Sequence, residues 1–281
     1  NLVNSGNIQD GYNLFLQLAK DNDAEAQYFL GQLNGQEQFN INNQQESFYW
    51  TKLSADQNYT DALIYLAFLY IDGKGTDKNL SKAHEVFQKA AELNTPDAFY
   101  NLAHNYTFGK GVSKNISKAI KWNEKLINYN NIIDDIDLYY ELTGIQGLYF
   151  IYMWEDGFQN FDKAFQFAKQ LVDKRGTGVD YDRLAYFYQA GISTRLDYEK
   201  SFELYSIASE KGELNAMEML ANLYFDGNGT KQDYKKAYEI YNYLDDLPEY
   251  KLSLSNKITL EDFYRFGYGN IKIDYQKALQ F

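Results

Sequence analysis

Apolar residues follow a helical period in this chain, and the pattern recurs after 36 residues. The segment 61–70 has alanine, leucine, alanine and tyrosine at four positions, and 97–106 has the same residues there. Counted from the first alanine, these positions have offsets 0, +4, +5 and +8. They share one face of a helix at about 100° per residue. Weaker copies of this first helix, the A helix, begin at Ala26, Asp180 and Ala216. The sequence therefore predicts repeated amphipathic helices.

A second pattern follows each A helix. It reads Gly73-Lys74-Gly75, recurs unchanged at 109–111 and recurs as Gly-Asn-Gly at 227–229. A few residues later, seven Ala or Ser residues each have Asn or Asp four positions upstream. Asn and Asp are preferred N-caps because their side-chain oxygen accepts from a free backbone N–H, and glycine is suited to ending a helix. We therefore predict that seven B helices begin at these caps: Asn43, Asn79, Asn115, Asn160, Asp197, Asp233 and Asp274.

The two helices of each repeat have apolar stripes that neither can bury alone, so neighbouring hairpins must share a core. We expect an all-α fold, an α/α superhelix of antiparallel helix hairpins forming a single solenoid domain over 1–281. The fourth repeat is irregular, because Gln146 takes the anchor position 48 residues after Ala98 and about twelve residues around 130–143 are extra. The expected repeats span 24–58, 59–94, 95–130, 136–175, 178–212, 213–247 and, in part, 254–281, after a B-type helix over 8–20.

The segment 61–83, with its Asp-Ala start, Gly-Lys-Gly turn and Asn-Leu-Ser-Lys-Ala end, resembles the SEL-like (Sel-one-like) repeat. This family is similar to the tetratricopeptide repeat. The resemblance implies an adaptor, a right-handed superhelix whose concave surface receives a protein or peptide. Such proteins occur in bacterial host-interaction and envelope proteins and in eukaryotic quality-control complexes. The first repeat departs from the pattern at Gly35-Gln36-Glu37, and the last has Glu261 where a small residue belongs.

Composition narrows the possible partners. The formal charge of −12 disfavours nucleic acid and anionic membrane surfaces, and no apolar run approaches the roughly 18 residues of a membrane span. With no Cys and two separated His residues, we expect neither a metal nor a cofactor. The excess of Asn, Lys, Tyr and Ile favours a bacterial protein of the envelope or a secreted one, with a eukaryotic ER lumen as the alternative. Because the chain starts at Asn1, we expect any export signal to precede it. The oligomeric state stays open.

Offsets +2, +3 and +6 of the A helices lie opposite the core stripe and are expected to line the concave face. Aromatic residues and Arg, which are frequent binding anchors, occupy many of these positions. An alternative is that +2 and +3 pack on the next A helix, whereas +6 favours the groove. The candidate partner-binding residues are Tyr65, Phe68, Tyr100, His104, Tyr149, Tyr152, Arg183, Tyr186 and Asn222.

The hypothesis that follows is a non-enzymatic protein-binding scaffold. One alternative is an all-helical enzyme, such as a toroidal carbohydrate hydrolase, for which Glu155 and Asp156 could supply half of a carboxylate pair. Another is a structural module that positions a neighbouring domain. The Gly73-Lys74-Gly75-Thr76 segment lacks the spacing of a phosphate-binding loop, and its recurrence marks it as a turn.

Overall fold

The computed structural model describes residues 8–36, 43–129 and 134–280, and these residues form α-helices without a strand. The all-α prediction is confirmed. A short 3-10 helix, η3 (Tyr268–Asn270), also occurs. The α-helices are α1 (Ile8–Lys20), α2 (Ala24–Gly35), α3 (Gln44–Asp56), α4 (Thr60–Asp72), α5 (Leu80–Glu92), α6 (Pro96–Phe108), α7 (Ile116–Ile127), α8 (Asp134–Trp154), α9 (Phe161–Lys174), α10 (Gly178–Ala190), α11 (Tyr198–Glu210), α12 (Leu214–Asp226), α13 (Tyr234–Asp245), α14 (Leu254–Phe266) and α15 (Tyr275–Ala278).

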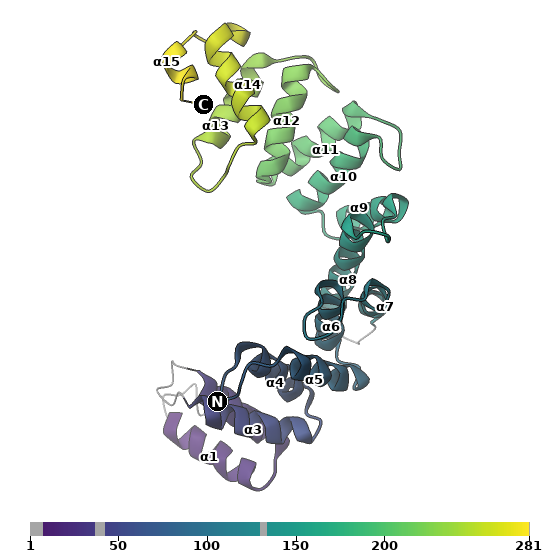
Figure 1. The fold of residues 1–281 in the computed structure, drawn as a ribbon, viewed down its shortest axis with the longest axis vertical. Coiled ribbons are helices and arrows are strands. Elements are labelled where there is room, and N and C mark those ends of the chain that lie inside the picture. Colours follow the sequence, from purple (N-terminus) through teal and green to yellow (C-terminus); the bar gives the residue numbers. More distant parts are fainter. Residues whose placement is uncertain (1–7, 37–42, 130–133, 281) are drawn as a thin grey trace. The chain divides into compact units, whose positions relative to one another are not determined.

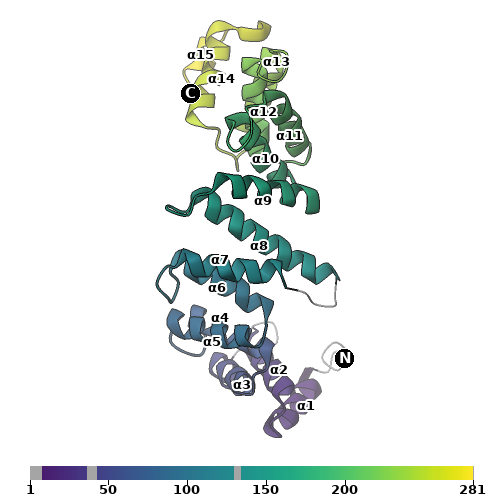
Figure 2. The same ribbon diagram turned by 90° about the vertical axis from the view of Figure 1, so that its right-hand side faces the viewer.

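The chain divides into two compact units, Asn1–Ile151 and Tyr152–Phe281, and the division falls within α8. In unit 1, α2 packs with α3, α4 with α5, and α6 with α7 (Figure 1). In unit 2, α10 packs with α11, α12 with α13, and α14 with α15 (Figure 2). Each unit is thus a stack of helix hairpins in chain order, in which the even-numbered A helices alternate with odd-numbered B helices.

All seven predicted Asn and Asp residues cap B helices. In each case the side-chain oxygen accepts a hydrogen bond from the backbone N–H three residues later, as Asn79 does from Lys82 at 2.9 Å. The backbone N–H of the same cap donates to a carbonyl in the last turn of the A helix, from Asn79 to Tyr70 at 2.8 Å. This pair of hydrogen bonds fixes the turn between the two helices of a repeat.

The aromatic residue at offset +8 accepts the cap hydrogen bond through its carbonyl, and its ring also contacts a lysine of the B helix. A lysine three residues after the cap places its ammonium group over the ring, which is a cation–π contact. Lys118 Nζ lies 5.0 Å from the ring centre of Tyr106, and Lys236 Nζ lies 4.9 Å from that of Tyr224. The same contact joins Lys82 to Tyr70, Lys163 to Tyr152 and Lys277 to Tyr264.

The second glycine of the turn lets successive repeats touch. Gly111 has a φ of +70°, and a Cβ atom on it would lie 2.0 Å from the carbonyl oxygen of Leu80, the first residue of α5. Gly75 has the same relation to Gln44, at 1.9 Å. Any side chain there would separate the turn from the B helix of the preceding repeat. The spacing between hairpins is thus set at these glycines as well as in the core.

Small and large apolar residues alternate in the core of each unit. In unit 1, Ala62, Ala98 and Leu102 are fully buried, and Phe87 fills the space beside them. In unit 2, the corresponding cluster surrounds Tyr241 and Phe263. Alanine at the anchor positions lets the two helices of a hairpin approach closely, as the sequence pattern predicts.

The fourth repeat has a different register from the predicted one. The N–H of its cap, Asn160, donates to the carbonyl of Tyr152 at 2.9 Å, so Tyr152 corresponds to Tyr70 and Tyr106. Counting back eight residues puts the anchor at Gly144 instead of Gln146. A Cβ atom on Gly144 would lie 2.7 Å from the carbonyl oxygen of Asn123, so α8 crosses α7 closely there. Of the extra residues, those from Asp134 onward belong to α8, which has 21 residues. The other A helices and the B helices α3 to α13 have 12 to 14.

Candidate protein-binding surface

The predicted binding residues of unit 1 have unequal environments. Phe68 and Tyr100 are exposed, at 42% and 47%, and His104 is partly buried. Tyr65, at offset +3, packs against Tyr28 of the preceding A helix, with ring centres 6.4 Å apart. Tyr65 is therefore a packing position, but it packs on the preceding A helix and the alternative named the next one. Phe68 and Tyr100 present their rings to solvent.

Two predicted surface residues, Tyr149 and Tyr152, are buried, with 6% and 8% exposure. The shifted register explains this correction: they stand at offsets +5 and +8, which face the core, instead of +3 and +6. Tyr152 accepts a hydrogen bond from Lys163 Nζ at 3.3 Å and stacks on Phe167. The residue at +6 of the fourth repeat is Phe150, which is 38% exposed.

In unit 2, two of the three predicted residues have polar partners within the chain. Arg183 lies 3.8 Å from the carboxylate of Asp180, which also binds Arg175 at 2.6 Å. Asn222 accepts a hydrogen bond from the hydroxyl of Tyr241. Tyr186 differs from these, because its ring is 41% exposed.

The buried Asp180 takes an anchor position that alanine holds in other repeats. Burial alone would raise the pKa of its carboxyl, but hydrogen bonds from Arg175 and from the side chain and backbone of Thr177 outweigh it, so the pKa is lowered. Asp180 therefore stays ionised in the core and holds the turn before α10. The departure from alanine is the one feature of the sequence that indicates this ion pair.

Four rings in unit 1 form a continuous row, which we call the aromatic surface. They are the exposed Tyr100, Phe108 and Phe150 and the partly buried His104. Tyr100 stacks on His104 with ring centres 6.4 Å apart, His104 lies 4.7 Å from Phe108, and Phe108 lies 6.0 Å from Phe150. The first three residues come from consecutive turns of α6, and the fourth comes from α8. Phe108 is 52% exposed.

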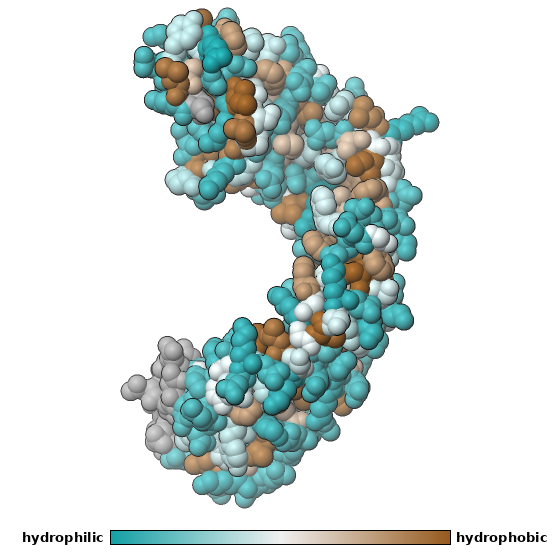
Figure 3. Space-filling view, viewed as in Figure 1, coloured by the Kyte–Doolittle hydropathy of each residue, from teal (hydrophilic) through white to brown (hydrophobic). Residues whose placement is uncertain are grey.

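Phe108 and Phe150 were absent from the predicted set. Phe150 was missed through the register error, and Phe108 stands at offset +10, where α4 and α12 carry Asp72 and Asp226. Phe108 could have been identified from the sequence, because an aromatic residue stands there in place of the repeated aspartate. Hydrophobic side chains reach the surface of both units (Figure 3), and exposed rings also touch in unit 2, where Phe266 lies 5.8 Å from Tyr268. The aromatic surface is a row of four rings from α6 and α8.

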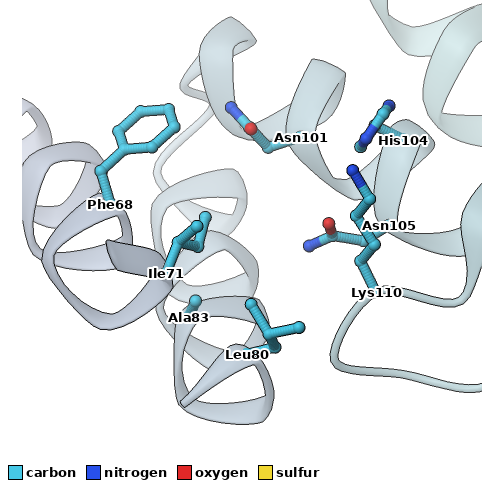
Figure 4. A pocket seen from close by; sticks show the side chains of 8 residues that line it. All are labelled: Phe68, Ile71, Leu80, Ala83, Asn101, His104, Asn105 and Lys110. Atoms are coloured by element: carbon cyan, nitrogen blue, oxygen red, sulfur yellow. The ribbon is translucent and has the colours of Figure 1, made fainter. Parts of the chain in front are cut away.

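A cavity of about 220 Å³ adjoins the aromatic surface between α4, α5 and α6. In Figure 4, Phe68 stands at one side of the cavity, His104 and Lys110 stand at the other, and apolar side chains form its floor. Asn101 and Asn105 complete the α6 wall. The lining residues are Phe68, Ile71, Leu80, Ala83, Asn101, His104, Asn105 and Lys110.

The two histidines differ in function. Burial, followed by the charge of Lys110, lowers the pKa of His104, so its imidazole is neutral at pH 7 and Lys110 is the positive group at the cavity. His84 is 5% exposed, and its Nδ1 lies 3.4 Å from Asn105 Nδ2. His84 is thus a core residue beneath the surface.

Within the described residues, no His, Asp and Glu side chains group as three or more potential metal ligands. None of the helices described has the length and apolarity needed to cross a membrane. Asp156 is exposed in the turn after α8, and Glu155 beside it is partly buried. Asp72 and Asp226 are the last residues of α4 and α12 at offset +10, and with the anchor at Gly144 their counterpart is Trp154, the last residue of α8.

Stacked hairpins with an N-capped B helix and a two-glycine turn define a helical-repeat solenoid, a class whose units cannot bury their apolar faces alone. The chain belongs to the Sel1 repeat family. The model of the Sel1 repeat matches most of the chain, at residues 24–59, 60–95, 96–127, 181–213, 214–242 and 250–281, and leaves out the irregular fourth repeat. Sel1-repeat proteins are helical scaffolds that are generally non-enzymatic and typically mediate protein interactions.

Solved structures share the fold. One is c5321, a protective antigen present in uropathogenic Escherichia coli strains and displaying an SLR fold, with 22% identity and a TM-score of 0.76. The alignment covers 96% of this chain and 54% of the other, so the chain spans about half the length of that protein. Another is a Sel1 repeat protein from Oxalobacter formigenes, with 23% identity, a TM-score of 0.64 and coverage of 89% and 94%. No curated protein sequence matches the chain.

Proposed function

We propose that this chain is a non-enzymatic scaffold that holds a segment of a partner protein on the aromatic surface of unit 1. The observation that carries the proposal is the run of ring contacts from Tyr100 to Phe150 across two A helices. Exposed aromatic rings cost free energy in water unless a partner covers them, and aromatic residues are enriched at the centres of protein interfaces.

The charge of the chain supports a protein partner over other macromolecules. A net charge of −12 repels the phosphates of nucleic acids and anionic lipids. The aromatic surface is largely uncharged, because its four members are three aromatic hydrocarbon or phenol rings and an imidazole that is neutral at pH 7. A location in the bacterial envelope stays a proposal, because the likeness to the Escherichia coli antigen is one of fold.

The proposal is tested by replacing three rings of the aromatic surface together, Tyr100→Ser, Phe108→Ser and Phe150→Ser. The wild type and the triple variant are each used as bait in an extract of the source cells, and the captured proteins are compared quantitatively by mass spectrometry. We expect at least one protein to be captured by the wild type and to be reduced about tenfold or more with the variant, because loss of hot-spot rings costs more than about 1 kcal/mol each.

A matched control removes exposed apolar residues from outside the aromatic surface of the same unit, with Tyr49→Ser on α3 and Leu93→Ser after α5. These side chains are 53% and 42% exposed. The control should retain the captured protein. Equal capture by the wild type and the triple variant, with unchanged circular dichroism, would show that the aromatic surface is not the binding site.

A further inference from the structure

The lysine of the Gly-Lys-Gly turn has different surroundings in two repeats. In the second repeat, Lys74 Nζ lies 3.3 Å from the carboxylate of Asp72, two residues earlier. In the third repeat, the residue two before Lys110 is Phe108, so the equivalent carboxylate is missing. Among the residues that the structure describes, Lys110 has no ion-pair partner, and its ammonium lies 6.0 Å from the ring centre of Phe108. Other described lysines, such as Lys82 and Lys118, also have a cation–π contact and no ion pair, so the feature that distinguishes Lys110 is its position beside the cavity.

This lysine is also the one charged residue that lines the cavity beside the aromatic surface. The floor of the cavity is aliphatic, from Ile71, Leu80 and Ala83, and Phe68 forms one side of it. Lys110 and His104 lie together at the opposite side (Figure 4). An apolar volume of about 220 Å³ with a cation at its edge suits a ligand that has a bulky apolar group next to an anion.

We propose that this cavity receives, from the partner segment, a large apolar side chain followed directly by an acidic residue whose carboxylate pairs with Lys110. The inference rests on the proposed function and specifies the sequence that the aromatic surface selects. The apolar side chain enters between Phe68 and His104, and the carboxylate replaces the partner that Asp72 provides for Lys74.

The geometry favours a carboxylate over a phosphate group. A dianionic phosphate is typically held by Arg residues or by several donors at once, whereas one flexible lysine provides a single point charge. The net negative charge of the chain does not prevent this pairing, because at about 0.15 M salt charges more than about 8 Å away are largely screened. The local charge of Lys110 therefore decides which residue is accepted beside the cavity.

Two synthetic peptides test the inference: acetyl-Gly-Ser-Phe-Glu-Ser-Gly-amide and the same peptide with Gln in place of Glu. The chain has only two histidines, so the imidazole proton resonances of His104 and His84 report binding in one NMR titration, with His104→Gln for assignment. We expect the Glu peptide to shift the His104 resonance and to bind about threefold or more tightly than the Gln peptide at low salt. The bound carboxylate should also raise the pKa of His104.

Lys110→Gln should remove the preference for Glu, so that both peptides bind with the affinity of the Gln peptide. The matched control is Lys74→Gln, which changes the equivalent lysine of the preceding turn and should keep the threefold preference. Both lysines are exposed, so neither change should alter the fold, and circular dichroism confirms this directly.

Equal binding of the two peptides by the wild type would overturn the recognition of the carboxylate and leave apolar binding in place. Absence of any His104 shift with either peptide would overturn the whole inference. Neither result decides the proposed function, because that is judged by capture with Tyr100, Phe108 and Phe150 replaced, and none of these residues lines the cavity.

Discussion

The position two residues after the anchor is occupied by Tyr100 in α6 of unit 1 and by Glu218 in α12 of unit 2. Tyr100 is 47% exposed, and Glu218 is 5% exposed. Four residues further on, His104 belongs to the aromatic surface, whereas Asn222 is bonded to Tyr241. The two A helices have the same position in their repeats, but the face that carries these residues is exposed in α6 and covered in α12.

In unit 2, this face of α12 is covered by a later segment of the same chain. Glu218 accepts hydrogen bonds from the backbone N–H of Ser253 at 3.0 Å, from Asn256 Nδ2 at 2.7 Å and from the hydroxyl of Tyr250. The connection between α13 and α14 and the first turn of α14 therefore lie over this part of α12. Sel1-type A helices can thus use one face either to bind their own chain or to leave it free for another. This contrast supports the proposal that a partner binds in unit 1.

The comparison is tested most strongly by removing each of the two side chains. Glu218→Ala should lower the free energy of unfolding by about 2–4 kcal/mol, because it leaves the Ser253 N–H and the Asn256 amide buried without an acceptor. Tyr100→Ala should change it by less than about 0.5 kcal/mol, as is usual for an exposed site. Urea unfolding measures both, and hydrogen exchange locates the loss in α12 and α14.

Similar losses for the two variants would mean that Tyr100 is held within unit 1 as firmly as Glu218 is within unit 2. Glu218→Gln serves as an intermediate control. It retains an acceptor oxygen and removes the charge, so it should cost less than Glu218→Ala.

A smaller effect is expected from Asp182, which takes the same +2 position in α10. Burial, then the negative charge of Glu213, raises the pKa of Asp182 to about 6, and Arg183 opposes the rise. The unfolded value is about 3.9. A carboxyl group with a raised folded pKa destabilises the fold above about pH 6, and this penalty disappears as the pH falls below about 4. Asp182→Asn should therefore stabilise unit 2 by about 1–2 kcal/mol at pH 7.5 and by almost nothing at pH 4.

Thermal or urea unfolding of Asp182→Asn and the wild type across this pH range checks the sign. Asp162→Asn, a change at an exposed residue of α9, tests whether any reduction of the net negative charge gives the same gain. A stabilisation that persists at pH 4, or one that Asp162→Asn reproduces, would contradict the raised pKa as its cause.

The order of the helices and the starts of the B helices could be predicted from sequence because they depend on residues close together in the chain. A cap and the N–H that it accepts from are three residues apart, and the apolar stripe is visible within one helix, so all seven B-helix starts were correct. The fourth repeat was misplaced because Tyr149 occupies the usual small position, and Gln146, which precedes Gly147, was taken as the anchor. The cover over Glu218 comes from residues 32 to 38 positions away, and no periodic pattern indicates it.

The candidate surface was predictable only in part for the same reason. Phe68, Tyr100 and His104 have positions that follow from the regular repeats around them. The exposure of Phe150 depends on the register of α8, which is set by the cap hydrogen bond to Tyr152. Lys110 lacks the carboxylate partner that Lys74 has because Phe108 stands where the second repeat has an aspartate. This could have been seen by comparing the turns with one another as well as with a common pattern.

The smallest predicted effect concerns the N-caps of the B helices, which both units have. Asn115 and Asp233 cap α7 and α13 in matched surroundings, because each accepts from the N–H three residues later, at 2.9 and 3.0 Å, and each donates its own N–H to a tyrosine carbonyl at 2.8 Å. We expect Asn115→Ala and Asp233→Ala each to cost about 1 kcal/mol in urea unfolding. Asn115→Asp should change stability by only a few tenths, since both residues are good caps. If the two alanine variants lost stabilities that differed by more than about 1 kcal/mol, the capped turns of the two units would themselves differ in stability. The contrast between Tyr100 and Glu218 could not then be attributed to what covers the A helix.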